Sequence, residues 1–593
     1  MVKKKKLPQV YVHMILFFIV SLLFVLGFNY PNVCFARSDF SFHYERLNGL
    51  IEALRSGVLK AFVYYGNYKY GYAVAAYYPD LLMLPFAALG FFGVQTVTIL
   101  RMFLVVVKFL EFCIAYFGYD DIFHDKKNAL LFSAFYGLSG AAGQQMIHFA
   151  LGRILVHAFF PLIINGVYHI VYCKDKPHIL YLGLILIAYS NIVFLFVVGL
   201  ALIVYIVIRH RDVFSDRRIV AGFFVSGILA VCCSAVAWMP FLTDFIGIGN
   251  QLYVYTSETK HIGESFYLFF TIISVMLPSL VSDYTVWLHN FQSSSFYMFA
   301  AFVVFLAYIC IMWFIHKRSS YKKKKAVMLL ITCLYLWSEF FPWIYLGPVY
   351  DFVLRIELFF RLAVIVDIVL AYLVIDFWDK YNTILLSWLL ASSLSGVLFA
   401  CATFITLENS YDIPIEPGKL TDDYIESVKP YDVNPGYHAG NGLLICSKYG
   451  VDFEYFIREY SEYLWKCQDR FSDKSRWYYA VDYDLIEIDE YKQPVEFDRT
   501  DKFGVFKAYL DKDHTVVPLI DYTGYKVFDE NGVFYGHKTT DYGFIDCDIT
   551  EPRWYYIKLG YTLPQILSFI LFGLGAFGIL FYILKERRRK WLL

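Results

Sequence analysis

The sequence of 593 residues lacks net charge, because 52 lysines and arginines balance 52 aspartates and glutamates. Nothing global therefore favours a nucleic-acid partner. It also lacks a glycine-rich phosphate loop, the cysteine and histidine spacing of a zinc site, a nucleophile elbow and an Asp-x-Asp pair in its outer loops. We accordingly predict neither a metal nor another cofactor.

Apolar side chains are abundant instead: 59% of the residues are hydrophobic, 20% are aromatic, and the mean hydropathy is +0.50. Such values exclude an ordinary soluble enzyme and predict a polytopic α-helical membrane protein with about 12–13 crossings. After a first segment at Val10–Phe28, apolar stretches follow at 75–93, 96–117, 128–147, 154–172, 179–208, 219–242, 264–281, 295–315, 326–346, 358–378, 381–405 and 559–584.

Clusters of basic residues predict the topology, since they favour the cytoplasmic side. For these clusters to share one side, either 75–93 or 96–117 must fail to cross, and 264–281 must re-enter or lie flat. The long stretch 179–208 should form two half-spans that meet at Tyr189–Asn191 on the outer side. The clusters are Lys3–Lys6, Lys126–Lys127, Lys174–Lys176, Arg209–Arg218, Lys317–Lys325, Lys380 and Arg587–Lys590.

The first apolar segment has no convincing cleavage site after it, so we predict an uncleaved anchor with Asp39 just outside the membrane. The residues after Asp39 predict an amphipathic helix lying on the membrane surface. Its apolar face would hold Leu47, Leu50, Ile51, Leu54 and Val58, and its polar face Glu45, Arg46, Glu52 and Arg55.

Residues 407–557 are polar and acidic, which predicts a soluble extracytoplasmic domain before a last span and a basic cytoplasmic tail at 558–593. Strands are predicted at Gly504–Leu510 and Thr515–Tyr522, and a hairpin around Asp529–Gly532. Three cysteines here, Cys446, Cys467 and Cys547, leave the disulfide state open. The remaining units are the anchor at 1–29, the outer loop at 30–74 and the membrane domain at 75–406.

Several charged residues are predicted to face the outer surface as a reaction site. Asp39, next to His43 and Arg46, could act as a general base toward a hydroxyl group, although it could equally be the N-cap of the surface helix. Asp80 could join it or cap a helix of its own. Three further residues suit a phosphate or a polar ligand near the membrane, unless they only snorkel or form helix pairs: His148, Arg153 and Arg361.

Short motifs along nearly the whole chain resemble the YfhO-like bacterial membrane proteins and the relatives labelled 6-pyruvoyl-tetrahydropterin-synthase-related. They include an Asp-x-x-Phe-His-x-x-Arg-like opening and a later Tyr-x-Pro-like motif. The motifs are Ser38–Leu47, Gly71–Tyr72, Tyr77–Pro79, Tyr136–Gly140, Gly152–Arg153, Pro161–Leu162, Ser190–Asn191, Ala237–Pro240, Phe360–Leu362, Val517–Pro518 and Tyr522–Tyr525.

This resemblance implies the GT-C superfamily of integral-membrane glycosyltransferases, with a catalytic aspartate at Asp39. It implies a polyprenyl-phosphate sugar donor and a cell-envelope glycan, lipid, polymer or protein acceptor. Arg153 and Arg361 match recurring arginines, to which we assign the donor phosphate. The second acid of many such enzymes has no clear counterpart except Asp80. Two alternatives therefore stay open: a transporter or flippase of lipid-linked saccharides, which the lack of an internal repeat disfavours, and an assembly factor without activity.

Overall fold

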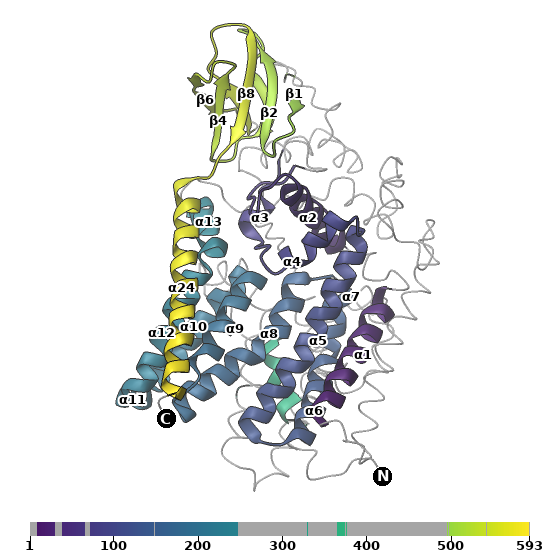
Figure 1. Ribbon diagram of the computed structural model, residues 1–593, viewed down its shortest axis with the longest axis vertical. Helices are drawn as coiled ribbons and strands as arrows, with labels where there is room; N and C mark the ends of the chain where they lie inside the picture. Colours follow the sequence, from purple (N-terminus) through teal and green to yellow (C-terminus); the bar gives the residue numbers. More distant parts are fainter. Residues whose placement is uncertain are drawn as a thin grey trace, which may run out of the picture.

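Helices fill one end of the protein and β-strands the other (Figure 1). The computed structural model describes residues 9–29, 38–65, 71–147, 149–246, 329, 364–369, 371–373, 375, 495, 497–540 and 543–591. The predicted stretches 264–281, 295–315 and 381–405 lie outside these residues, as do Cys446 and Cys467.

Three described helices are long and apolar enough to cross a membrane: α1 (Gln9–Asn29), α8 (Leu151–Tyr168, continued by a π turn, η3, His169–Cys173) and α24 (Leu563–Trp591). A fourth candidate is the pair α12 (Arg217–Cys233) and α13 (Ala235–Ile246), which bend by 69° at their junction. The described residues thus contain three or four candidate spans, and the predicted 12–13 crossings stay a prediction.

The stretch 75–93 does not form a long helix. It folds into α3 (Val74–Tyr77), α4 (Leu84–Ala87) and a 3-10 turn, η2 (Ala88–Phe92), whereas α5 runs from Thr96 to Phe123. Of the two stretches, 75–93 is therefore the one whose helices are too short to cross a bilayer.

The predicted break in the stretch 179–208 is present. Helix α9 (Pro177–Ser190) ends at Asn191, which caps α10 (Ile192–Ile208) by accepting a hydrogen bond from the backbone N–H of Phe194. An asparagine at this position satisfies a backbone donor that the new helix leaves free. The predicted span 128–147 is likewise broken, into α6 (Lys126–Gly137) and α7 (Gly140–Ile147).

Small residues allow α8 to approach α9 closely. A Cβ atom placed on Gly166 would lie 2.5 Å from the backbone of Leu180, so only glycine fits there. Gly152, at the other end of α8, faces Ser190 and Asn191 in the same way. Close backbone approach through small residues is a usual way to pack helices in membranes.

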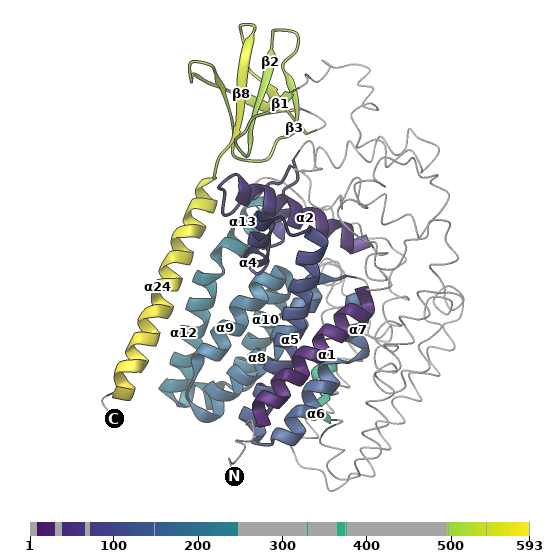
Figure 2. The same ribbon diagram turned by 45° about the vertical axis from the view of Figure 1, so that its right-hand side comes forward.

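The start of α1, helix α11 (His210–Ser215) and the end of α24 lie at the same end of the molecule, opposite the strands (Figures 1 and 2). The basic cluster Arg209–Arg218 therefore lies at the end of the molecule that also holds the start of α1 and the end of α24. The alternation of crossings that the basic residues predict stays a prediction.

The strands form two antiparallel sheets. The first has the order β1 (Phe497–Arg499), β2 (Val505–Leu510), β8 (Arg553–Leu559), β4 (Tyr525–Asp529) and β5 (Phe534–Tyr535). The second has the order β3 (Val516–Ile520), β7 (Phe544–Cys547) and β6 (His537–Thr539). Strands β2, β3 and the β4–β5 hairpin confirm the predicted strands, and Cys547 is a buried free thiol.

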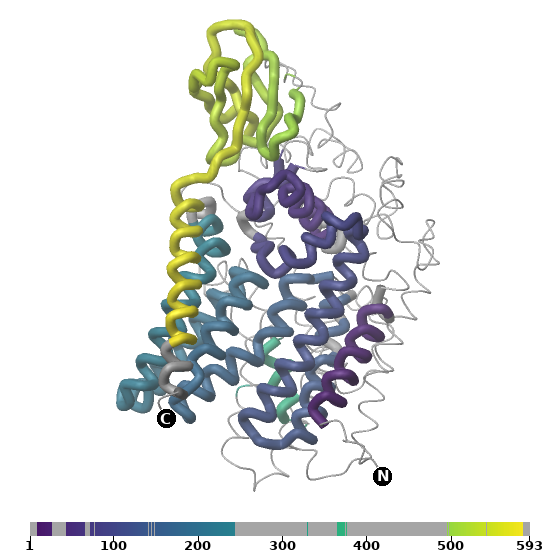
Figure 3. The backbone as a smooth tube through the Cα atoms, in the orientation of Figure 1, coloured from purple at the N-terminus to yellow at the C-terminus, as the bar shows by residue number. Residues whose placement is uncertain are grey.

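The sheets dock onto the loop that follows α2 (Ser38–Arg55). The hydroxyl groups of Tyr65 and Tyr525 lie 2.9 Å apart, and the Arg499 guanidinium donates a hydrogen bond to the backbone carbonyl of Tyr65. At the start of α24, Tyr561 donates to the carbonyl of Lys60. Strand β8 passes into α24 without a long linker (Figure 3), so the sheets are held above the helices at two points.

Helix α2 corrects one prediction. Leu47, Leu50 and Leu54 are buried as expected, but Glu45 and Arg46, which we predicted on the polar face, are buried as well. Glu52 is only partly buried and Arg55 is exposed, as predicted, so protein covers the polar face in the first half of the helix and leaves it open near its end. The physical reason is that Arg46 pairs with an acid 34 residues later in the chain.

Candidate functional site

A buried polar cluster lies between α2 and the turn that precedes α4, and Asp80 is its centre. The Arg46 Nε donates to Oδ1 of Asp80 at 2.6 Å, and the Tyr64 hydroxyl donates to Oδ2 at 2.6 Å. Lys60 Nζ lies 3.4 Å from the same Oδ2. Three donors thus converge on one carboxylate that is only 2% exposed, so Asp80 serves as an anchor for cations rather than as a free base.

Arg46 uses its whole fork of donors. Besides Asp80, it donates from Nη2 to the carbonyl of Pro79 at 2.9 Å and from Nη1 to Nδ1 of His43 at 3.2 Å. Its guanidinium also lies over the ring of Tyr78. The loop that carries Asp80 is consequently fixed against α2 by a side chain that lysine could not replace.

His43 is neutral in this arrangement, because an arginine can only donate and Nδ1 of His43 must therefore accept. Burial, and after it the charge of Arg46, holds the pKa of His43 well below its usual range. Burial likewise lowers the pKa of Lys60, against the attraction of Asp80, and it raises the pKa of Tyr64. The cluster thus combines a neutral imidazole with two cations that share one carboxylate.

The neutral state of His43 predicts sensitivity to acid. An unfolded histidine takes up a proton below pH about 6.5, whereas the folded one does not, so stability is constant above that pH and falls below it. We expect a loss of up to about 1.4 kcal/mol per pH unit below pH about 6.5, and His43→Gln should remove this part of the pH dependence. Unfolding of both proteins in detergent at pH 7.5 and 5.5 tests this; equal acid sensitivity of the two would contradict it.

Position 39 lies near the start of α2. Residues 39, 43 and 46 are four and seven positions apart, so they share one face of the helix. The structure thereby places the backbone of Asp39 on the face where His43 and Arg46 meet Asp80. Because α2 begins at Ser38, Asp39 is its second residue rather than the N-cap residue before the helix. Its role as a general base stays a prediction.

A cavity of about 160 Å³ lies beside this cluster, between the loop after α2, the sheets and the start of α24. Lys60 belongs to both, because it lines the cavity and contacts Asp80. Its wall is mixed: small and aliphatic residues form about half of it, and aromatic rings and hydroxyl groups, which can contact a sugar ring, form part of the rest. Among the lining residues are Phe62, Tyr522, Thr523, Tyr561 and Gln565.

Other predicted site residues are not brought to this cluster. Arg153 lies in the first turn of α8 and is partly exposed, while His148 and Arg361 lie outside the described residues. His157, four residues after Arg153 on α8, belongs to a second buried cluster among the helices.

This second cluster joins α5, α8 and the helical residues 364–369, and sequence reasoning missed it. His157 has Glu111 Oε1 at 3.1 Å from Nδ1 and Asp367 Oδ2 at 2.6 Å from Nε2. Lys108 Nζ lies 3.0 Å from Glu111 Oε1. Ser139 donates to Asp367, and the Tyr136 ring stacks on His157 with the ring centres 4.1 Å apart.

The charges of this cluster balance only when His157 is an imidazolium. Ionised carboxylates accept but do not donate, so each ring nitrogen of His157 must carry a proton. Lys108 and His157 then contribute two positive charges, and Glu111 and Asp367 two negative ones. The sequence signal was available, since charges within an apolar stretch such as 96–117 are costly and usually functional.

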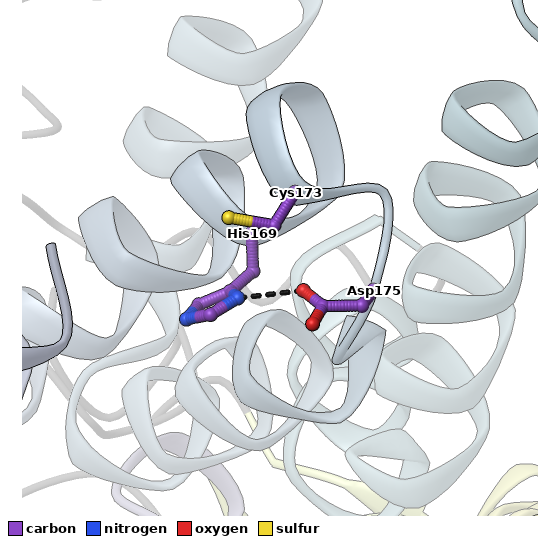
Figure 4. Close-up of side chains that lie close together, drawn as sticks. All are labelled: His169, Cys173 and Asp175. Carbon is purple, nitrogen blue, oxygen red and sulfur yellow. Dashed lines mark hydrogen bonds and ion pairs between the residues drawn. The ribbon is translucent and has the colours of Figure 1, made fainter.

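A third cluster lies at the far end of α8 (Figure 4). His169 Nδ1 lies 2.7 Å from Asp175 Oδ1, and its Nε2 lies 2.5 Å from Asp121 Oδ2. Cys173 and Asp175 are exposed, and their ligand atoms and a ring nitrogen of His169 lie within 4.8 Å of one another.

Comparison of the chain with protein-family models, with curated proteins and with solved structures finds no match.

Proposed function

We propose that this chain is an integral-membrane glycosyltransferase that moves a sugar from a polyprenyl-phosphate donor to a cell-envelope acceptor on the outer face. The observation that carries the proposal is the pair of cations at Asp80. Buried Arg46, on the face of α2 that also holds position 39, and partly buried Lys60, from the loop after α2, share this one carboxylate. Two cations beside a cavity with aromatic rings in its wall suit a phosphate and a sugar together.

In the proposed reaction, Asp39 takes the proton of an acceptor hydroxyl, and the oxygen attacks the anomeric carbon of the donor sugar. The bond between that carbon and the phosphate oxygen breaks, and polyprenyl phosphate leaves with the electron pair. Lys60, which lines the cavity, stabilises its charge, and Arg46 holds Asp80 in place beside Lys60. The resemblance alone assigns Arg153 and Arg361 to the donor phosphate. Neutral His43 accepts a hydrogen bond from Arg46 and thereby helps to hold Arg46 against Asp80.

The resemblance to YfhO-like proteins, from which the reaction type and the donor are taken, supports this proposal because its first motif contains Asp39, His43 and Arg46. In the structure, the second motif, around Tyr77–Pro79, adjoins Asp80 and contributes the Pro79 carbonyl that Arg46 binds. Two motifs quoted for the resemblance therefore meet at one buried cluster.

Membranes that carry wild-type protein should release polyprenyl phosphate from one member of a panel of lipid-linked sugars. Asp39→Asn should lower that release by about 100-fold, because asparagine keeps the size and a hydrogen-bond acceptor of aspartate in the first turn of α2 but cannot take up the proton. The matched control is Asp125→Asn, which changes the N-cap of α6 in the same way far from the site and should keep full activity. Equal release by wild type and Asp39→Asn would refute the general-base role.

The buried Lys108–Glu111–His157–Asp367 cluster favours a second candidate function, a transporter of lipid-linked saccharides. Transporters carry such charges within the membrane. Flipping of a fluorescent lipid-linked sugar in proteoliposomes separates the two: a transporter moves it without releasing polyprenyl phosphate, and Glu111→Gln would stop the movement.

A further inference from the structure

We propose that the end of α8 holds a divalent transition-metal ion such as Zn²⁺, with His169, Cys173 and Asp175 as ligands. The site is separate from the cluster around Asp80 and does not depend on the proposed function. Three donor atoms of the three kinds that such ions bind, nitrogen, sulfur and oxygen, lie within 4.8 Å of one another there.

The local fold brings these side chains together. His169 and Cys173 are four residues apart at the two ends of the π turn η3, so both project from one side of it. The chain then reverses into α9, which places Asp175 against Nδ1 of His169 (Figure 4). The spacing His-x-x-x-Cys-x-Asp is not one of the familiar zinc patterns, so sequence reasoning passed over it.

The orientation of His169 provides an independent observation. Its Nε2 faces Asp121 of α5 at 2.5 Å, which leaves Nδ1 on the side of Asp175 and Cys173. A metal-binding histidine usually donates its other ring N–H to a carboxylate, which fixes the ring and strengthens the ligand. Asp121 occupies this supporting position and is itself held by Lys176 at 3.1 Å.

The charges of the side chains at this site can be balanced when a divalent ion is bound. With a divalent ion, neutral His169 and a Cys173 thiolate, the three positive charges of the ion and Lys176 balance the three negative charges of Asp121, Asp175 and the thiolate. The thiol proton, and any proton on Nδ1 of His169, leave to solvent when the metal binds. Lys176 lies on the Nε2 side of the ring and does not block Nδ1.

Cobalt is a suitable probe, because a Co²⁺–thiolate bond absorbs in the near ultraviolet. The full chain, purified in detergent and stripped with a chelator, should bind one Co²⁺ with this absorption, and Zn²⁺ should displace it. Cys173→Ser should abolish the band, whereas Cys232→Ser, at a partly exposed cysteine outside the site, should keep it. Asp121→Asn should keep the band but weaken binding by about 10–100-fold.

A wild-type protein without the band would overturn the proposal, as would a band that survives Cys173→Ser, which would show cobalt bound elsewhere. Retention of the same elution profile by the Cys173→Ser protein shows that loss of the band is not loss of folding. Glycosyl transfer need not be measured, so failure of this site and failure of the proposed function are distinguishable.

Discussion

Glu111→Gln is expected to destabilise the folded protein by about 3–5 kcal/mol, because it removes one partner of a buried pair. Lys108 would keep its charge without a carboxylate, in a place where it is 2% exposed and surrounded by the rings of Phe24 and Phe112. The midpoint of unfolding by a denaturing detergent in mixed micelles measures the effect.

A second substitution, at Lys108, separates the effect of the unpaired charge from the effect of the changed side chain at position 111. In Lys108→Met/Glu111→Gln the unpaired cation is gone, while the glutamine oxygen can still accept from His157, and His157 and Asp367 balance each other. Replacing a whole buried pair is often nearly neutral, so the double variant should recover most of the loss. A double variant less stable than Glu111→Gln would contradict this account. Asp120→Asn, a partly exposed acid on the same helix, should stay within about 0.5 kcal/mol of wild type.

The elements that the sequence predicted are those set by local patterns. The apolar run of α1, the break at Tyr189–Asn191 and the β4–β5 hairpin each depend on neighbouring residues, and each is present within a few residues of its predicted position. The last helix begins at Leu563 rather than at residue 559, because β8 continues through Leu559.

The buried clusters could not be predicted in the same way, because their partners are distant in sequence. His157 meets Glu111 46 residues earlier and Asp367 210 residues later. Helical spacing alone placed Arg46 on a polar face toward water, and only its pairing with Asp80 explains why that face is buried. Patterns predict which residues share a helix face, whereas ion pairs decide what that face is packed against.

Asp80→Asn should be more destabilising than Arg46→Gln, because two cations, Arg46 and Lys60, contact the single carboxylate of Asp80. Removing Arg46 leaves Asp80 with Lys60 and Tyr64, so its carboxylate is still neutralised and bonded. Removing the charge of Asp80 leaves Arg46 and Lys60 as buried cations with no shared carboxylate. We expect about 3 kcal/mol for Arg46→Gln and about 5 kcal/mol for Asp80→Asn, the two ends of the range for broken buried pairs.

The same unfolding midpoints test this order, with Arg55→Lys as the control, because Arg55 is exposed on the same helix and lysine can still donate to the Gly90 carbonyl that Arg55 binds. The opposite order, with Arg46→Gln the less stable variant, would mean that the contacts of Arg46 to Pro79 and His43 outweigh the charge of Asp80. Added polyprenyl phosphate gives a further distinction. If Arg46 and Lys60 bind the donor phosphate, it should restore stability to Asp80→Asn more than to Arg46→Gln, since it supplies the missing negative charge.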